Sequence, residues 1–350
     1  MILSIILLAS AGMLSSASRM IPGFAQWYSE TVYPLLQGTL GRLAGLFPFS
    51  AAEWLCVLLP AFLLIHFMCT CRKDAAKRIL SVIILIVSVL FFMYTVNCGI
   101  NYYRNPFVDS EAFARARFTE DELVDFCECT ADQLAGMSVS GDSTDFAYPD
   151  WDELSAESVR AMSSLSSLSE PSFNDYRSLS GFYPQPKKMA WISRLFSMMG
   201  VSGIYSPFTI EANVNGEMVG LEMPFTACHE LSHLKGFMNE GEANYIGWLA
   251  CINSDNAAFN RSGWIMAWIY AGNSLHAIDP EKYLSIKEKL PDDVIRELRE
   301  NSEFWKKHEN KASEVQDRVN DAYLNSHGQE HGIHTYSQLT TLMLMWYSAK

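Results

Sequence analysis

The sequence predicts a mainly helical, α+β protein in which N-terminal transmembrane helices precede a largely helical domain. Long apolar stretches without charge concentrate in the first hundred residues. The later part carries helix caps and the spacing of amphipathic helices. A short segment rich in β-forming residues stands directly before two histidines that are four residues apart. These observations predict helices around one small β-hairpin or edge strand.

The formal charge separates two parts of the 350-residue chain. Residues 1–100 carry six Lys or Arg and three Asp or Glu, so their net charge is +3, and the total of −13 leaves −16 for residues 101–350. We therefore expect a membrane domain over the first part and a separate domain over the second. The acidic second part argues against a nucleic-acid partner, whose phosphates require Lys and Arg.

Three stretches are apolar enough to cross a lipid bilayer. Residues 79–98 contain no charge and match the ~20 residues that a span needs. Residues 55–71 are a shorter stretch, and Pro60 within it is tolerated in membrane helices. The uncharged N-terminus is either a span or a cleaved signal peptide, and the lack of a basic leading region favours the span. The expected spans are at about residues 1–18, 54–71 and 79–98.

The short basic loop RKDAAKR, residues 72–78, joins the second and third spans. Short loops rich in Lys and Arg stay on the cytoplasmic side of a membrane. The domain over residues 101–350 is therefore expected to be the extracytoplasmic part of a multi-pass cell-membrane protein that has the lipid bilayer as a partner.

The second domain is predicted to be a series of helices with one β segment. Thr119 can cap a helix, because acidic residues fill the turn that follows it. The turn-rich residues 138–152 predict a loop, and residues 189–200 predict a short amphipathic helix. Residues 203–225 predict the hairpin or irregular edge strand. Further helices are expected towards the C-terminus, including a charged one over residues 280–325.

The eight cysteines contain no C-x-x-C pair, so a cysteine zinc site is not expected. Cys228 and Cys251 flank the motif region. They are expected to be buried thiols, and a disulfide between them is the alternative.

The stretch FTACHELSHLKGFMNEGEAN, residues 225–244, contains the residues that suggest a function. His229 and His233 share one face of a helix, where they can bind one zinc ion. Glu230 then lies beside the ion as a general base that takes a proton from water. This H-E-x-x-H arrangement is typical of zinc peptidases. The neighbouring residues are apolar, so the helix is expected to be buried, where these three side chains would be costly without a metal.

A third zinc ligand is expected among the acidic residues that follow. Glu240 lies seven residues after His233. On a continuous helix that is about 10 Å further along the axis, which is too far for one ion. Gly236 can end the helix, so that a second helix starts shortly before Glu240 and brings it to the metal. Glu242 is the alternative ligand if the turn is tighter. Asn244 can hydrogen-bond a ligand histidine as a supporting group.

Further segments match a known family in the right order over most of the chain: FPFSAAEWL, NYYRNPF, GIYSPFTIEANVN, PFTACHELSHLKGF, EGEAN, VNDAYLN and GIHTYSQL. In these segments the chain resembles an uncharacterised bacterial membrane family, the DUF3810 domain of unknown function, which is assigned to the zinc-peptidase-like group. The resemblance implies a zincin-like domain with zinc at His229, His233 and Glu240, and it implies no substrate. The segment EGEAN also resembles gluzincin peptidases, although Asn244 replaces their aspartate. Asparagine at 239 excludes the metzincin pattern, which requires histidine there.

Two further features are candidates for parts of an active site. Zincins usually add a Tyr or His that stabilises the oxyanion. Tyr336 is the first candidate, and the alternatives are His334, His331 and Tyr323. Residues 211–215, which begin with Glu211, are a candidate edge strand that holds a peptide by strand addition.

The sequence therefore favours a membrane-anchored zinc metallopeptidase that hydrolyses a peptide or protein substrate, with zinc-activated water as nucleophile and Glu230 as base. The alternative is a non-catalytic, zinc-stabilised sensor or scaffold that binds a peptide or a cell-wall fragment. The presence of Glu230 favours the enzyme, because a binding protein needs no general base.

Overall fold

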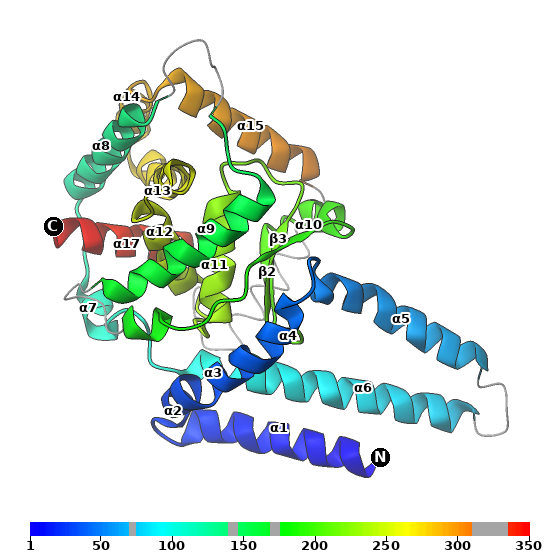
Figure 1. Cartoon of the computed structure of the whole chain (residues 1–350). Helices are drawn as coiled ribbons and strands as arrows, with labels where there is room; N and C mark the ends of the chain where they lie inside the picture. The colour runs from blue at the N-terminus through cyan, green and yellow to red at the C-terminus, as the bar shows by residue number, and fades with distance from the viewer. Residues whose placement is uncertain (70–74, 139–145, 169–175, 310–334) are drawn as a thin grey trace. The chain divides into compact units, whose positions relative to one another are not determined.

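The computed structural model describes residues 1–69, 75–138, 146–168, 176–309 and 335–350. The described chain is mainly helical with one three-stranded sheet, which confirms the predicted class (Figure 1). It forms two compact units. The first unit comprises Met1–Asn105 together with Tyr205–Glu211, and the second comprises Pro106–Ile204 together with Ala212–Lys350. A short internal segment of the chain is thus part of the N-terminal unit.

The first unit contains three helices that are long and apolar enough to cross a membrane. They are α1 (Ile2–Met20), α5 (Ala51–Cys69) and α6 (Ala75–Asn97). They agree with the three expected spans, although α5 begins a few residues earlier than predicted. Between and after them lie α2 (Phe24–Thr31), α3 (Tyr33–Leu36), η1 (Gln37–Gly41), α4 (Arg42–Gly45) and η2 (Gly99–Tyr103).

Helix α1 packs along α6 through small side chains (Figure 1). Ser4, Ala11 and Ser18 are the buried residues of α1, and they recur every seven residues on one face. Ser88 of α6 is buried as well. Small residues of this kind allow two membrane helices to approach closely.

The segment Tyr205–Glu211 is fixed within the first unit by side-chain hydrogen bonds. The Tyr205 hydroxyl donates to the carbonyl of Asn97 at 3.1 Å. It also accepts a hydrogen bond from the Tyr33 hydroxyl at 2.9 Å. The Asn97 amide in turn donates to the carbonyl of Pro207 at 2.6 Å. We call this segment the inserted loop.

The Glu211 carboxylate closes the inserted loop and caps the start of α5. It accepts hydrogen bonds from the backbone N–H groups of Ala51 at 3.1 Å and Ala52 at 2.8 Å. The first N–H groups of a helix have no partner within the helix, and a carboxylate there also favours the helix dipole. Glu211 therefore has a structural role in the described chain.

The sheet consists of β1 (Lys187–Met189), β2 (Gly203–Ser206) and β3 (Glu211–Asn215), in the order β1-β3-β2. The predicted hairpin is present as β2 and β3. The prediction that residues 211–215 form an edge strand is wrong, because β1 pairs in parallel with the other side of β3, with Lys187 opposite Asn213. A three-residue strand between prolines and a short helix gives no alternating pattern that a sequence could reveal.

Apart from the sheet, the described part of the second unit consists mainly of helices. They are α7 (Ser110–Arg115), α8 (Glu120–Gly136), α9 (Trp151–Ser164), α10 (Ser193–Met198), α11 (Met223–Leu234), α12 (Glu240–Ile252), α13 (Ala257–Ile278), α14 (Pro280–Lys287), α15 (Asp292–His308) and α17 (Thr335–Ser348), with single 3₁₀ turns η3 (Leu165–Ser167) and η4 (Tyr176–Leu179). Helices α11, α12 and α13 pack on one another, and α17 packs on α12 and α13. Trp248 and Tyr245 of α12 are fully buried in this core.

Several predicted boundaries are refined. Thr119 caps α8 in a complete capping box with Glu122, as the sequence predicts. The helix expected over residues 189–200 is shorter, because Met189 ends strand β1. The charged helix expected over residues 280–325 is divided into α14 and α15 ahead of residue 310, because Pro291 lacks the N–H that would continue it.

Replacing Glu211 with Ala should lower the thermal unfolding temperature of the full chain in detergent. The change leaves the N–H groups of Ala51 and Ala52 without their acceptor, which costs about 1–3 kcal/mol. The matched control is Glu300→Ala, which removes an exposed carboxylate from α15. Equal unfolding temperatures for the two variants would refute the capping role.

Candidate metal centre

Helix α11 carries the two histidines of the motif on a buried face. Pro224 stands in its first turn, where the missing N–H costs nothing. Leu231 and Leu234 are fully buried and fix the helix in the core. The rings of His229 and His233 lie 4.6 Å apart between centroids and are nearly perpendicular. The four-residue spacing thus brings both imidazoles to one place.

The carboxylate of Glu222 holds the N-terminus of α11 in position. It accepts hydrogen bonds from the Asn301 amide at 2.7 Å and from the indole N–H of Trp305 at 3.0 Å, both on α15. Burial raises the pKa of this carboxyl, and the two donors oppose that effect. The helix that carries the histidines is therefore tied to α15 as well as to the core.

The chain reverses direction at Gly236, as the sequence predicts. Gly236 has a φ of 88°, a left-handed conformation that favours glycine. Its N–H donates to the carbonyl of His233 at 2.8 Å, and the N–H of Phe237 donates to the carbonyl of Ser232 at 3.1 Å. These two bonds define a Schellman motif. Helix α12 then starts at Glu240, with the Asn239 side chain as its N-cap.

The reversal brings Glu240 to the two imidazoles. One carboxylate oxygen lies 3.4 Å from Nε2 of His229, and the other lies 3.5 Å from Nε2 of His233. The three ligand atoms all lie within 4.8 Å of one another. Tetrahedral ligands at ~2.0–2.1 Å from one zinc ion are about 3.3 Å apart. The residues present therefore fit a metal ion, and they form a candidate metal-binding group.

Glu242, the alternative ligand, is directed elsewhere. Its carboxylate is buried and accepts a hydrogen bond from the N–H of Val108 at 3.2 Å. Its own N–H donates to the capping side chain of Asn239 at 3.0 Å. The geometry therefore favours Glu240 as the third ligand.

His233 is oriented by the turn that follows it. Its Nδ1 lies 2.8 Å from the carbonyl oxygen of Phe237, to which it can donate a proton. This bond leaves the lone pair of Nε2 for the side on which Glu240 lies, as in metal sites where a carbonyl fixes a ligand histidine. The sequence did not single out Phe237. The Schellman motif that Gly236 predicts is the signal that points to this carbonyl.

The hydrogen bonds that would orient His229 are less well defined than those of His233. Asn244 lies half-buried on α12, one turn after Glu240. The Nδ1 atom of His229 is buried and has no hydrogen-bond partner among the described residues. The supporting role of Asn244 therefore stays a prediction.

Glu230 lies beside the group and next to strand β2. It is 3% exposed, and one of its carboxylate oxygens lies 4.0 Å from Nε2 of His229. A Cβ atom added at Gly203 would lie only 2.6 Å from that oxygen. Gly203 therefore leaves the space that the Glu230 side chain occupies.

The positive charge of His233 and the negative charge of Glu240 stabilise each other. Burial lowers the pKa of His233, but the carboxylates of Glu240 and Glu230 and the Phe237 carbonyl outweigh it and raise the pKa to about 9. Burial raises the pKa of Glu240, but the two histidines outweigh it and hold that pKa well below its usual range. Without a metal, a protonated His233 and an ionised Glu240 therefore form a partly buried ion pair.

Helix α17 begins beside the candidate ligand. The Gln338 amide donates to the Asn239 side chain at 3.3 Å, and a Cβ added at Gly241 would collide with Gln338. Tyr336 lies in the first turn of this helix, but its side chain is outside the described residues. The alternatives Tyr323, His331 and His334 are also outside them.

The two cysteines near the motif are buried free thiols. Cys228 precedes His229 on α11, and Cys251 lies near the end of α12. Burial, together with the adjacent Cys228 thiol, raises the pKa of Cys251 well above its usual value. Both thiols therefore contribute to the packing between α11 and α12.

Replacing Gly247 with Ala should disturb this packing. The added Cβ would lie 2.9 Å from the backbone nitrogen of His229, so α12 would have to move away from α11. Overpacking of this kind costs about 1–3 kcal/mol. The measurement is thermal unfolding of the full chain in detergent. The control is Gly136→Ala, because a Cβ at this exposed helical position meets nothing. A Gly247→Ala variant as stable as the control would contradict the close approach.

The comparisons with known proteins identify a family and no function. No curated protein and no solved structure shows significant similarity to the chain. The model of one protein family, DUF3810, described as a protein of unknown function, matches residues 28–344. Because this match covers most of the chain, the protein belongs to the DUF3810 family.

Proposed function

We propose that the protein is a membrane-anchored zinc metallopeptidase. The observation that carries this proposal is the convergence of His229, His233 and Glu240, with the buried carboxylate of Glu230 beside them. Two imidazoles and a carboxylate are a ligand set of catalytic zinc sites, which keep one position open for water or substrate. A carboxylate adjacent to such a set is suited to general-base catalysis.

Each residue has a distinct part in the proposed reaction. His229, His233 and Glu240 would hold zinc, which would act as a Lewis acid and lower the pKa of water. Glu230 accepts a proton from the attacking water and then delivers it to the leaving amine. The Phe237 carbonyl accepts the Nδ1 proton of His233, so that the neutral ring would present the lone pair of Nε2 to the ion. A non-catalytic sensor or scaffold, which is the alternative, would have no use for a buried base at Glu230.

The position of strand β2 supports a peptide as substrate. In the order β1-β3-β2, β2 is at one edge of the sheet, and its first residue, Gly203, borders Glu230. An edge strand can pair with the backbone of an extended peptide. A peptide held on β2 would have its carbonyl groups near Glu230. Strand β2, and not residues 211–215 at the centre of the sheet, would therefore bind the peptide by strand addition.

The proposed position of the enzyme in a membrane rests on the three apolar helices and on the basic residues between the second and the third. The helices are long and apolar enough to span a bilayer. The basic residues within 72–78, of which Lys77 and Arg78 belong to the first turn of α6, favour a cytoplasmic position by the positive-inside rule. We therefore place residues 101–350 outside the cytoplasm, where the substrate would be an extracytoplasmic peptide or protein.

Metal analysis of the full chain purified in detergent tests the site. We expect about one zinc ion per wild-type chain and loss of the ion in His233→Ala. Val294→Ala in α15 is a control for a buried substitution elsewhere in the second unit. A folded wild-type protein that takes up no zinc would refute the metal centre.

Replacing Glu230 with Gln tests catalysis separately from metal binding. We expect zinc to be retained and hydrolysis of a mixture of quenched fluorescent peptides to fall by ~10²–10⁴-fold. Glu300→Gln is the control for loss of an exposed carboxylate. Full activity of Glu230→Gln would refute its role as the base. Zinc binding by a wild type that cleaves no peptide would favour the sensor or scaffold.

Zinc affinity should rise with pH between about 6.5 and 9. In the metal-free protein the pKa of His233 is raised to about 9, so the ion must displace a proton at neutral pH. Each displaced proton changes the apparent affinity about tenfold per pH unit. The same raised pKa stabilises the metal-free fold below pH 6.5, and that stabilisation is lost as pH rises through 9. Zinc competition titrations and unfolding curves at several pH values would check both trends, and pH-independent affinity would contradict them.

A further inference from the structure

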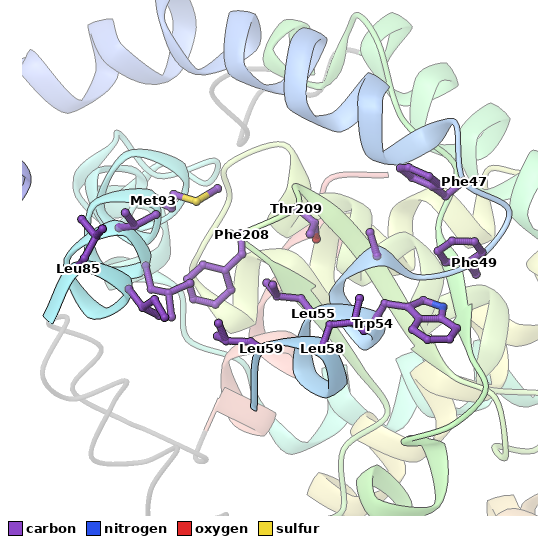
Figure 2. Close-up of a pocket in the computed structure, with 14 residues that line it drawn as sticks. Phe47, Phe49, Trp54, Leu55, Leu58, Leu59, Leu85, Met93, Phe208 and Thr209 are labelled. Atoms are coloured by element: carbon purple, nitrogen blue, oxygen red, sulfur yellow. The ribbon is translucent and has the colours of Figure 1, made fainter. Parts of the chain in front are cut away.

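The first unit contains a large apolar pocket that the proposed reaction does not use. Its volume is about 860 Å³, which is within the ~300–1,000 Å³ of small-molecule sites (Figure 2). The lining residues come from α5, α6, the segment before α5 and the inserted loop: Phe47, Phe49, Ala51, Trp54, Leu55, Leu58, Leu59, Leu85, Ile86, Val89, Leu90, Met93, Phe208 and Thr209.

Two walls of the pocket are helix faces that are turned towards each other. Leu55, Leu58 and Leu59 recur at three- to four-residue spacing on α5, so they share one face. The lining residues of α6, from Leu85 to Met93, recur in the same way. The helices come together towards residues 69 and 75 and separate towards their other ends (Figure 1). The lining residues of α5 and α6 therefore face each other across a space, whereas in two closely packed helices they would be in contact.

The inserted loop keeps this space open. Glu211 binds the first N–H groups of α5, and Pro207 is bound by Asn97 at the end of α6. The loop is thus bonded to both helices, and Phe208 lies between these attachments. Figure 2 shows the Phe208 ring between the lining side chains of α6 and those of α5. The pocket is therefore bounded by fixed elements on three sides.

The lining selects a hydrocarbon ligand. Among the described lining residues, Trp54 and Thr209 carry the only nitrogen or oxygen atoms in side chains, and the Thr209 hydroxyl donates to the Ser206 hydroxyl at 2.9 Å. Water or a polar ligand would find few partners here. An empty space of this size would deprive the lining of dispersion contacts.

The surroundings of the two helices indicate the source of that ligand. Both α5 and α6 are long and apolar enough to cross a bilayer. The medium next to such helices is the acyl region of the membrane, about 30 Å thick. We propose that the pocket between α5, α6 and Phe208 is a binding site for an acyl chain of a bilayer phospholipid. This site is independent of the metal centre, and its test does not depend on zinc.

Photolabelling in a membrane tests the proposal. The full chain is reconstituted in phosphatidylcholine vesicles that contain a small fraction of phosphatidylcholine with a diazirine at the end of one acyl chain. We expect label on the peptide that contains Phe208 and Thr209, in addition to label on helix faces exposed to lipid. Lipid that only surrounds the protein would label exposed positions such as Leu64, which is 60% exposed and does not line the pocket.

Two substitutions separate the pocket from the surrounding lipid. Leu58→Trp fills the pocket from α5, and we expect several-fold less label on the Phe208 peptide. Leu64→Trp places the same side chain elsewhere on α5 and should leave that label unchanged. Val89→Trp fills the pocket from α6 and serves as a second variant if Leu58→Trp does not fold, as judged by its thermal transition. Absence of label at Phe208, or equal label in all variants, would overturn the proposal.

Discussion

The reversal of the chain at Gly236 is the constraint on which the candidate metal centre depends. His233 and Glu240 are too far apart on a straight helix to share an ion. The left-handed glycine ends α11, and its Schellman motif starts the return towards α12. The same turn presents the Phe237 carbonyl to His233. Gly247 then allows α12 to lie against the backbone of α11 at His229. Two glycines thus define the distance between the ligands.

The arrangement of charged side chains differs between the candidate metal centre and the rest of the core. Arg261 is fully buried, yet Asp293 at 2.7 Å and Glu297 at 3.2 Å surround its guanidinium. That cluster contains its own countercharges and donors, as buried ions require. The histidine group also contains its countercharge, in Glu240, but its two Nε2 atoms and its carboxylate converge on one point that a metal ion could occupy.

Much of the candidate centre could be predicted because its determinants are local. The spacing of His229 and His233, the glycine at 236 and the acidic residue at 240 all act within a few helical turns. The apolar spans were predictable for the same reason. Strand β1, the central position of β3 and the inserted loop were not, because they depend on pairing between distant segments. The role of the Phe237 carbonyl was not predicted, because a pattern of residue types does not show which backbone atoms accept hydrogen bonds. The roles of Asn244 and Tyr336 stay predictions.

The inserted loop makes the two units inseparable by simple truncation. The chain passes from the first unit to the second after Asn105, returns at Tyr205 and leaves again after Glu211. A fragment cut at Pro106 would retain Tyr205, Phe208 and Glu211 but lose Tyr33, Asn97 and the start of α5. Its apolar loop would be exposed, and such surfaces promote aggregation. A gene fusion or a domain exchange within the family would therefore have to include the membrane helices and the inserted loop together.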